Sequence, residues 1–147
     1  MSWVLISSKE RLLLSTKRSF PPSEFIKGVD LFNRQFYYEC HDVWEEIWSE
    51  AKGKEKIFYQ ALIMSAVSLY HFGNENIEGA LSCYQKGLER FGQLPDHFLQ
   101  FNIKEFVEQM ERFYSNIPTK KNLLTQDLLN KSRPIIQMEI SFFEKLM

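Results

Sequence analysis

The amino-acid sequence predicts an all-α protein, a compact bundle of about five to six helices. Three observations support this fold class. Apolar residues recur at helical spacing in several segments, helix-start and helix-stop signals separate those segments, and no segment sustains the alternation of a β-strand. A chain of 147 residues, of which 44% are hydrophobic, can bury a substantial core in one domain without disulfides or metal. The 13 phenylalanines indicate a core of large rings that pack edge to face.

The first helix is expected to begin at Pro21-Pro22-Ser23-Glu24. Proline fixes φ, a serine can cap the helix, and an acid favours the first turn. The helix should run to about Phe36 and bury four apolar residues, namely Phe25, Val29, Phe32 and Phe36. Residues 1–20 precede this signal, and we expect them to form a peripheral N-terminal extension of a single domain over residues 21–147.

The second and third helices should form the centre of the bundle. The second is expected over about 38–51 and ends at Lys52-Gly53-Lys54, where Gly53 can adopt a left-handed conformation. The third, over about 55–73, is apolar nearly all round. A helix of this kind is covered on most of its sides, so we expect it to be central.

The fourth helix, over about 76–91, should follow a turn in which Asn74 or Asn76 provides the cap. Its small and aromatic residues, Ala80, Tyr84 and Gly87, resemble the second helix of a tetratricopeptide repeat. The hairpin of the third and fourth helices could be simply close-packed, or it could form a peptide-binding groove.

The fifth helix is expected over about 102–115, because Asn102 and Glu105 have the spacing of a capping box. Beyond it, Ile117-Pro118 interrupts the pattern. Weaker helical patterns follow, and we expect a helical C-terminal tail over about 118–147.

Charge and cysteine content argue against several classes of partner. The net charge is −1, from 18 basic and 19 acidic residues, so no broad positive field would attract nucleic acid or an anionic membrane. No segment reaches the ~18 apolar residues that a membrane span needs. Cys40 and Cys83 are predicted to be reduced, which favours a cytoplasmic location. A homo-oligomer is left open.

The second helix carries the most specific chemistry of the chain. On a helix that turns about 100° per residue, His41 and Glu45 lie one turn apart beside Trp44 and Trp48. Three other acids of the helix should point to solvent, namely Glu39, Asp42 and Glu46.

Folding the second helix back on the third about Lys52-Gly53-Lys54 should bring Glu45 near Gln60, and His41 near Met64 and Ser65. The candidate polar pocket therefore consists of His41, Glu45, Gln60, Trp44 and Trp48. Glu39, His71 and Asn74 are secondary candidates.

This cluster has three interpretations. It can be a buried hydrogen-bond network that fixes helix register, a ligand-binding pocket, or a catalytic pair in which His41 and Glu45 exchange a proton. We expect neither a metal nor a cofactor. His71 is the obvious third ligand for a metal bound by His41 and Glu45. Glu45 is expected at the level of Gln60, however, and His71 lies about 16 Å from Gln60 along the helix axis.

The sequence also resembles a known family. The resemblance covers about residues 25–92 and rests on the patterns Phe32-Asn33-x-x-Phe36-Tyr37-x-Glu39-x-His41-Asp42-x-Trp44-Glu45-x-x-Trp48, Phe58-x-Gln60-x-Leu62-Ile63 and Tyr70-His71-x-Gly73-Asn74. They are similar to the domain of unknown function 309 family, small helical proteins of bacteria, archaea and plastids. The resemblance implies a compact helical bundle, and it implies no particular reaction.

From the sequence we therefore expect a non-enzymatic helical module that binds a partner protein or a small ligand. The expected surface is the face from His41 to Trp48 or the groove between the third and fourth helices. The alternative is a small hydrolase-type enzyme that uses His41 and Glu45 as general acid and base.

Overall fold

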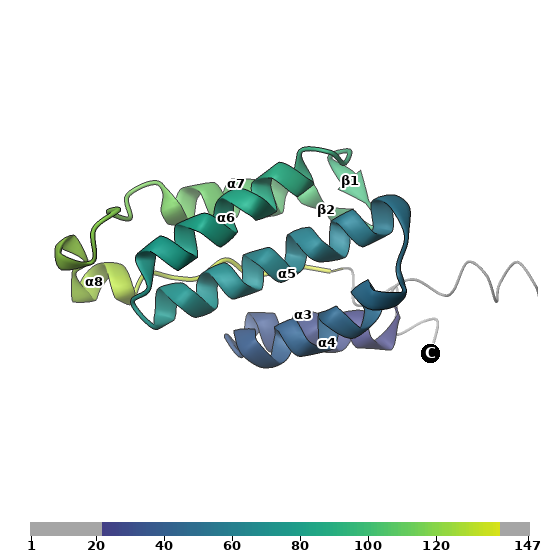
Figure 1. Cartoon of the computed structure of the whole chain (residues 1–147), viewed down its shortest axis with the longest axis horizontal. Helices are drawn as coiled ribbons and strands as arrows, with labels where there is room; N and C mark the ends of the chain where they lie inside the picture. The colour runs from purple at the N-terminus through teal and green to yellow at the C-terminus, as the bar shows by residue number, and fades with distance from the viewer. Residues whose placement is uncertain (1–21, 139–147) are drawn as a thin grey trace, which may run out of the picture.

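The structure, a computed structural model, describes residues 22–138 and confirms the all-α class (Figure 1). The helices in this range are α3 (Ser23–Asn33), α4 (Tyr37–Glu50), α5 (Gly53–Gly73), α6 (Ile77–Phe91), α7 (Ile103–Tyr114), the 3₁₀ helix η1 (Lys121–Leu123) and α8 (Gln126–Leu129). Strands β1 (His97–Phe98) and β2 (Phe101–Asn102) form a small antiparallel hairpin between α6 and α7. The expected N-terminal extension lies outside the described residues.

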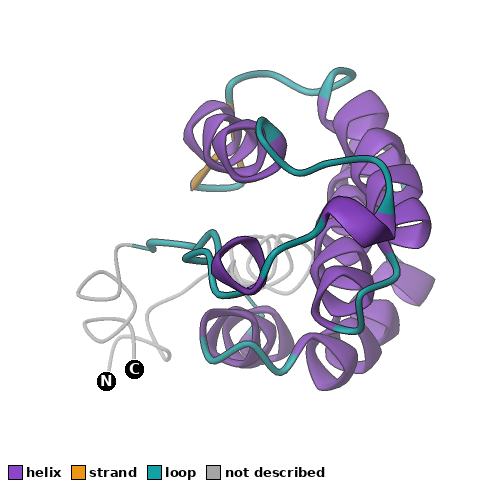
Figure 2. Cartoon of the chain, turned by 90° about the vertical axis from the view of Figure 1, so that its left-hand side faces the viewer, coloured by secondary structure: helices purple, strands orange, loops and turns teal. Residues whose placement is uncertain are grey.

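The helices form an open arc, in which α5 lies between α4 and α6 (Figures 1 and 2). The central position predicted for α5 is confirmed, because ten of its 21 residues are buried on several sides of the helix. The hollow of the arc lies between α3 and α7, and the segment that follows α8 runs through it (Figure 1). None of the helices in the described range is long and apolar enough to cross a membrane.

Two helical hairpins in the molecule have the same backbone plan, which the sequence analysis did not detect. We call α3 and α4 the first hairpin, and α5 and α6 the second. Gln35 and Glu75 have positive φ angles of 67° and 61° in the two turns, forty positions apart. In the first turn the Phe36 N–H donates to the Leu31 carbonyl over 2.8 Å. The second turn has the same bond from Asn76 to His71 over 2.9 Å.

The burial pattern also repeats with this spacing. Residues buried in the first hairpin have buried counterparts in the second, as in the pairs Phe32 and Phe72, Tyr37 and Ile77, Cys40 and Ala80, Trp44 and Tyr84, and Ile47 and Gly87. Only the phenylalanines are identical among these pairs. The backbone plan is therefore repeated with almost no repetition of residue identity, and the comparison with a tetratricopeptide helix stays a prediction.

The first helix ends earlier than predicted. α3 stops at Asn33, and the left-handed Gln35 reverses the chain. Phe25, Val29 and Phe32 are buried as predicted, but Phe36 is 46% exposed and does not belong to the core. The sequence pattern failed here because Phe36 falls in the turn, where helical periodicity no longer decides which way a side chain points.

The capping predictions for α6 and α7 are confirmed. The side-chain oxygen of Asn76 accepts from the Gly79 N–H, and that of Asn102 accepts from the Glu105 N–H, each over 3.0 Å. Gly53 has the predicted positive φ, 59°.

The predicted helical tail is wrong for the described part of residues 118–147. That part contains only η1 and α8, and residues 130–138 form no helix. Pro134 is the physical reason, because proline cannot donate a main-chain hydrogen bond and disfavours a helical conformation in the residue before it.

The core is built from aromatic rings, as expected. Phe72 and Phe113 pack edge to face with centroids 4.9 Å apart, and Phe32 and Phe106 do so at 5.7 Å. The second of these contacts joins α3 to α7 across the hollow of the arc. The two ends of the arc, α3 and α7, are therefore connected by contacts between aromatic side chains.

Candidate functional site

A pocket of about 190 Å³ opens between α4 and the C-terminal half of α5. Its lining consists of Tyr37, Tyr38, His41, Val67, Tyr70 and His71. On α4, Tyr38, His41 and Glu45 follow each other at helical spacing, so they lie on one face. This is the pocket that brings the predicted candidates His41 and His71 together.

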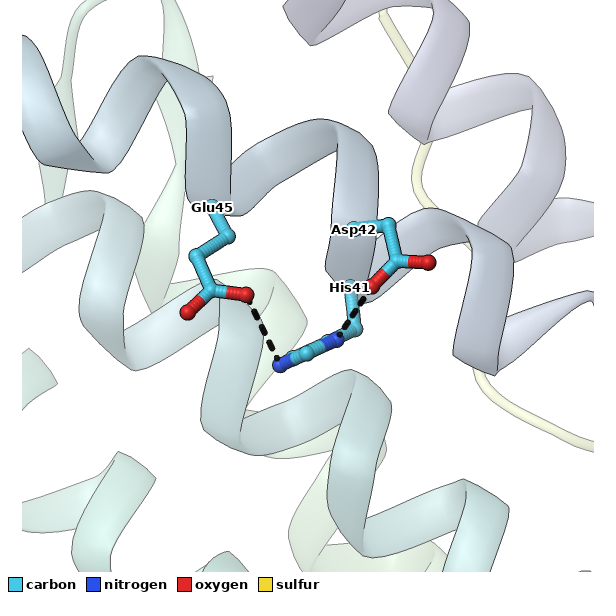
Figure 3. A group of neighbouring side chains, drawn as sticks. All are labelled: His41, Asp42 and Glu45. Carbon is cyan, nitrogen blue, oxygen red and sulfur yellow. Dashed lines mark hydrogen bonds and ion pairs between the residues drawn. The ribbon is translucent and has the colours of Figure 1, made fainter.

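The imidazole of His41 lies between two carboxylates (Figure 3). Its Nδ1 is 3.2 Å from Asp42 Oδ1, and its Nε2 is 3.4 Å from Glu45 Oε2. The side chain of His41 is 27% exposed, whereas those of Asp42 and Glu45 are more than half exposed. The predicted pairing of His41 with Glu45 is present, and it is open to solvent rather than enclosed.

Aromatic side chains form the other wall of the pocket. Tyr38 and Tyr70 are 54% and 40% exposed, and their ring centroids are 5.6 Å apart. His71 lies beside Tyr70, and its Nδ1 is 3.2 Å from Asn76 Nδ2. Tyr37 lies deeper, and burial raises the pKa of its hydroxyl above the usual range. The pocket therefore combines exposed aromatic rings with an imidazole that contacts two carboxylates.

Gln60 does not line this pocket, and its place beside Glu45 stays a prediction. It makes no side-chain hydrogen bond to His41 or Glu45 within residues 22–138, and it does not line the pocket. Ser65, which was expected near His41, instead faces Gly87 of α6.

The length of the connection affects which residues of α5 lie opposite His41. Ala51 and Lys52 both have extended backbone angles. Extended residues rise about 3.3 Å each and helical residues 1.5 Å, so the connection carries α5 past the end of α4 before the chain reverses. His41 consequently faces Val67 and the residues beyond it, a few positions further along α5 than an equal count from the turn predicts.

The tryptophans belong to the core and its edge. Trp44 is fully buried between Phe25 and Phe32, and its Nε1–H donates to the Phe25 carbonyl over 3.2 Å. A Cβ atom at Gly28 would lie 2.0 Å from Trp44 Nε1, so only glycine fits opposite this ring. Trp48 is partly buried, with Lys56 Nζ 4.4 Å from its ring centroid. Neither tryptophan lines the pocket.

The two remaining secondary candidates are also separate from the pocket. Glu39 is exposed on α4, and Asn74 caps the C-terminus of α5 through its main-chain N–H. The structure therefore gives Asn74 a place in the turn and brings neither residue to the pocket lining.

His41, Asp42 and Glu45 could together contact a cation. Each offers one ligand atom, and these atoms lie within 4.8 Å of one another. Three donors with an open side can bind a divalent ion that keeps water ligands. Exposed carboxylates often gather without such a role, so we assign no metal to the site.

Sequence reasoning missed Tyr38, Tyr70 and Asp42. Tyr38 precedes His41 by three positions, and this helical spacing was a usable signal. Tyr70 could not be found in this way, because its position opposite Tyr38 depends on the register between α4 and α5.

Comparison with known proteins agrees with the resemblance seen in the sequence. A sequence model of the family "Domain of unknown function (DUF309)" matches residues 25–83. An uncharacterized protein of Aquifex aeolicus (strain VF5) is 28% identical over 81 residues, which are 54% of this chain and 24% of that protein. The uncharacterized protein YpuF of Bacillus subtilis (strain 168) is 42% identical over 53 residues, 35% of this chain and 30% of that protein.

The matched region thus spans about a quarter to a third of the length of these curated relatives. It contains the first hairpin, α5 and the start of α6, including all the residues that line the pocket. Residues 25–83 of this chain are therefore similar to the DUF309 family, in agreement with the resemblance seen in the sequence.

Proposed function

We propose that this chain is a binding module whose pocket between α4 and α5 takes a positively charged side chain of a partner protein. The observation that carries the proposal is that Tyr38 and Tyr70, with exposed rings, line the pocket together with His41, whose imidazole contacts the carboxylates of Asp42 and Glu45. Aromatic faces attract cations, and nearby carboxylates strengthen that preference.

The size of the pocket favours a single side chain over a small-molecule ligand. Pockets that bury drug-sized ligands have volumes of about 300–1,000 Å³. The pocket here has about 190 Å³ and is open on one side. A lysine or arginine at the edge of a protein partner needs less room and can approach through that opening.

The repeated hairpin provides an internal control for the alternative that His41 only stabilises the fold. The positions equivalent to Tyr38, His41, Asp42 and Glu45 in the second hairpin are occupied by Glu78, Leu81, Ser82 and Gln85. This hairpin has the same turn geometry and burial pattern without a histidine between two acids. The backbone plan therefore does not require the cluster, which supports a role in binding.

Titration by NMR with a defined cation tests the proposal. We expect n-butylammonium to shift the side-chain signals of His41 and Tyr70, and neutral 1-butanol to shift them much less. The double variant Tyr38→Ala, Tyr70→Ala should lose the response. Phe36→Ala is the matched control, because Phe36 is also an exposed ring but does not line the pocket. An equal response to the alcohol, or none to the cation, would contradict the proposal.

A second candidate function is general acid–base hydrolysis, favoured by the position of His41 at ion-pair distance from Glu45 beside an open pocket. Activity profiling of the wild type against Glu45→Gln tests it directly. A folded variant with unchanged turnover would end the catalytic hypothesis.

A further inference from the structure

The segment after α8 lies in the hollow of the arc as an extended peptide. It runs back along α5, with α7 on one side and α3 on the other (Figure 1). Its side chains alternate in burial, since Pro134 and Ile136 are buried while Ile135 and Gln137 are exposed. This alternation is typical of an extended chain that has one face against a surface.

Two side-chain amides from opposite walls hold the main chain of this segment. Asn33 of α3 accepts the N–H of Ile136 and donates to its carbonyl, each over 2.8 Å. Gln109 of α7 accepts the N–H of Ile135 over 3.1 Å and donates to its carbonyl over 2.9 Å. These four hydrogen bonds involve only main-chain groups of the segment, so any residues other than proline can form them.

Arg133 supplies the contact that depends on side-chain type. Its guanidinium carbon lies 4.8 Å from the ring centroid of Phe72 and 5.4 Å from that of Phe113. Burial lowers its pKa, and no carboxylate pairs with it among the described residues. Its buried Nε has no hydrogen-bond partner within the same range. The arginine therefore enters an aromatic site, but its polar atoms are not fully matched there.

We propose that the groove between α3, α5 and α7 is a peptide-binding groove, and that residues 132–138 occupy it as an internal competitor. The ligand that replaces them is an extended segment of a partner protein. This segment contains an arginine, a proline and two apolar residues. This proposal concerns a different surface from the pocket of α4, and it stands or falls independently of the proposed function.

The manner of binding distinguishes this groove from ordinary core packing. A strand within a sheet is held by the main chain of its neighbours, whereas here two side chains reach from separate helices to the main chain of the segment. Side-chain amides of this kind can bind another peptide equally well after the tail leaves. A tethered segment competes at an effective concentration of about a millimolar, so the test must weaken the tail without changing the groove.

The test measures binding of a fluorescent peptide with the sequence of residues 132–138 to the full chain. The double variant Arg133→Ala, Ile136→Ala weakens the tail, and we expect it to bind the peptide at least about tenfold more tightly than the wild type. Ile135→Ala is the matched control, since that side chain is 43% exposed and should leave the tail in place. Adding Asn33→Ala and Gln109→Ala to the weakened tail should abolish binding. So should a peptide with alanine in place of its arginine.

A second measurement does not depend on the folding of any variant. In the wild type, excess peptide should accelerate hydrogen exchange at the amides of Ile135 and Ile136, because it captures the groove whenever the tail leaves. The amide of Leu69, in the C-terminal half of α5, should exchange at an unchanged rate.

Two results would overturn the proposal. If a folded chain with the weakened tail does not bind the peptide and exchange in the wild type does not change, the tail is a structural element only. If the wild type is a dimer that the tail variants convert to monomers, the occupant is the tail of a second copy rather than a partner protein.

Discussion

The first and second hairpins share a backbone plan but differ in the chemistry of their outward faces. Both turns contain a left-handed residue, Gln35 in one and Glu75 in the other, and every position that is buried in the first hairpin is also buried in the second. On the outward face, the first hairpin has His41 between two acids, whereas the second has Leu81 at the equivalent position. Substituting one hairpin's residues into the other can therefore separate the residues that the fold needs for stability from those that it does not need.

The inward faces differ in how each hairpin fills the space between its helices. In the first, the glycine at position 28 makes room for the ring of Trp44. In the second, Ser68 occupies the equivalent position and makes buried hydrogen bonds with the Ala80 carbonyl and the Tyr114 hydroxyl. At this position the first hairpin thus packs a ring against a glycine, whereas the second has a hydroxyl that hydrogen-bonds to α6 and α7.

The largest expected effect comes from truncating the central ring of each hairpin. Trp44→Ala should lower the free energy of unfolding by about 3–5 kcal/mol, because it leaves a cavity between Phe25 and Phe32. Tyr84→Ala should cost less, since Tyr84 is 9% exposed and Trp44 is fully buried. Urea denaturation measures both. An equal or larger loss for Tyr84→Ala would show that the second hairpin dominates stability.

A smaller effect is expected from adding one methyl group to the first hairpin. Gly28→Ala should cost about 1–3 kcal/mol, because the new Cβ would overlap the ring of Trp44. Gly73→Ala is the control. Apart from its chain neighbours and the backbone of its own helix, no atom lies within 4 Å of its Cβ position, and alanine favours a helix over glycine. Thermal denaturation of both variants should show destabilisation only at position 28. A neutral result there would contradict the tight fit of the ring.

The two hairpins should also differ in alkaline solution. Burial raises the pKa of the Cys40 thiol well above its usual value of 9.0, while the equivalent residue in the second hairpin is Ala80. A raised pKa means that its contribution to stability is full below pH 9 and is lost as pH rises further. Between pH 9 and 10 the free energy of unfolding of the wild type should therefore fall by about 1 kcal/mol more than that of Cys40→Ala.

Two buried tyrosines should lower the free energy of unfolding further at still higher pH. Burial raises the pKa values of Tyr37 and Tyr114, whose usual value is 10.0. Their contribution to stability is therefore lost above about pH 10, and Cys40→Ala should not prevent that part. Urea denaturation at stepped pH values separates the two ranges. If the wild type and the variant follow the same curve from pH 9, the thiol is not responsible.

The smallest effect on stability is expected from giving the first hairpin the outward residues of the second. The triple variant His41→Leu, Asp42→Ser, Glu45→Gln should change the free energy of unfolding by only about 0.5 kcal/mol, because the removed pairs are largely exposed. The response to n-butylammonium should nevertheless disappear. A loss of more than about 2 kcal/mol would instead assign the cluster a structural role.

Much of the fold followed from local signals. The caps at Asn76 and Asn102, the left-handed Gly53 and the apolar circumference of α5 depend on residues close in sequence, and all are confirmed. The repeat was not detected because a backbone plan can recur with different side chains of similar burial. The end of α3 was misplaced because a left-handed glutamine leaves no signal comparable to glycine.

The candidate site was only partly predictable. His41 and Glu45 were found because both lie on one helix, where spacing determines proximity. Tyr70 was missed, and the place of Gln60 stays a prediction, because both depend on the register between α4 and α5. The extended backbone at Ala51 and Lys52 determines that register, and apolar periodicity carries no information about it.

By itself, the sequence determined most of the helices, the apolar circumference of α5 and the pairing of His41 with Glu45. These features arise from interactions within one or two helical turns. Only the tertiary structure decided that Tyr70 and His71 complete the pocket and that residues 132–138 lie against Asn33 and Gln109. The physical reason is that such contacts join segments far apart in the chain, whose relative position depends on the packing of the whole arc.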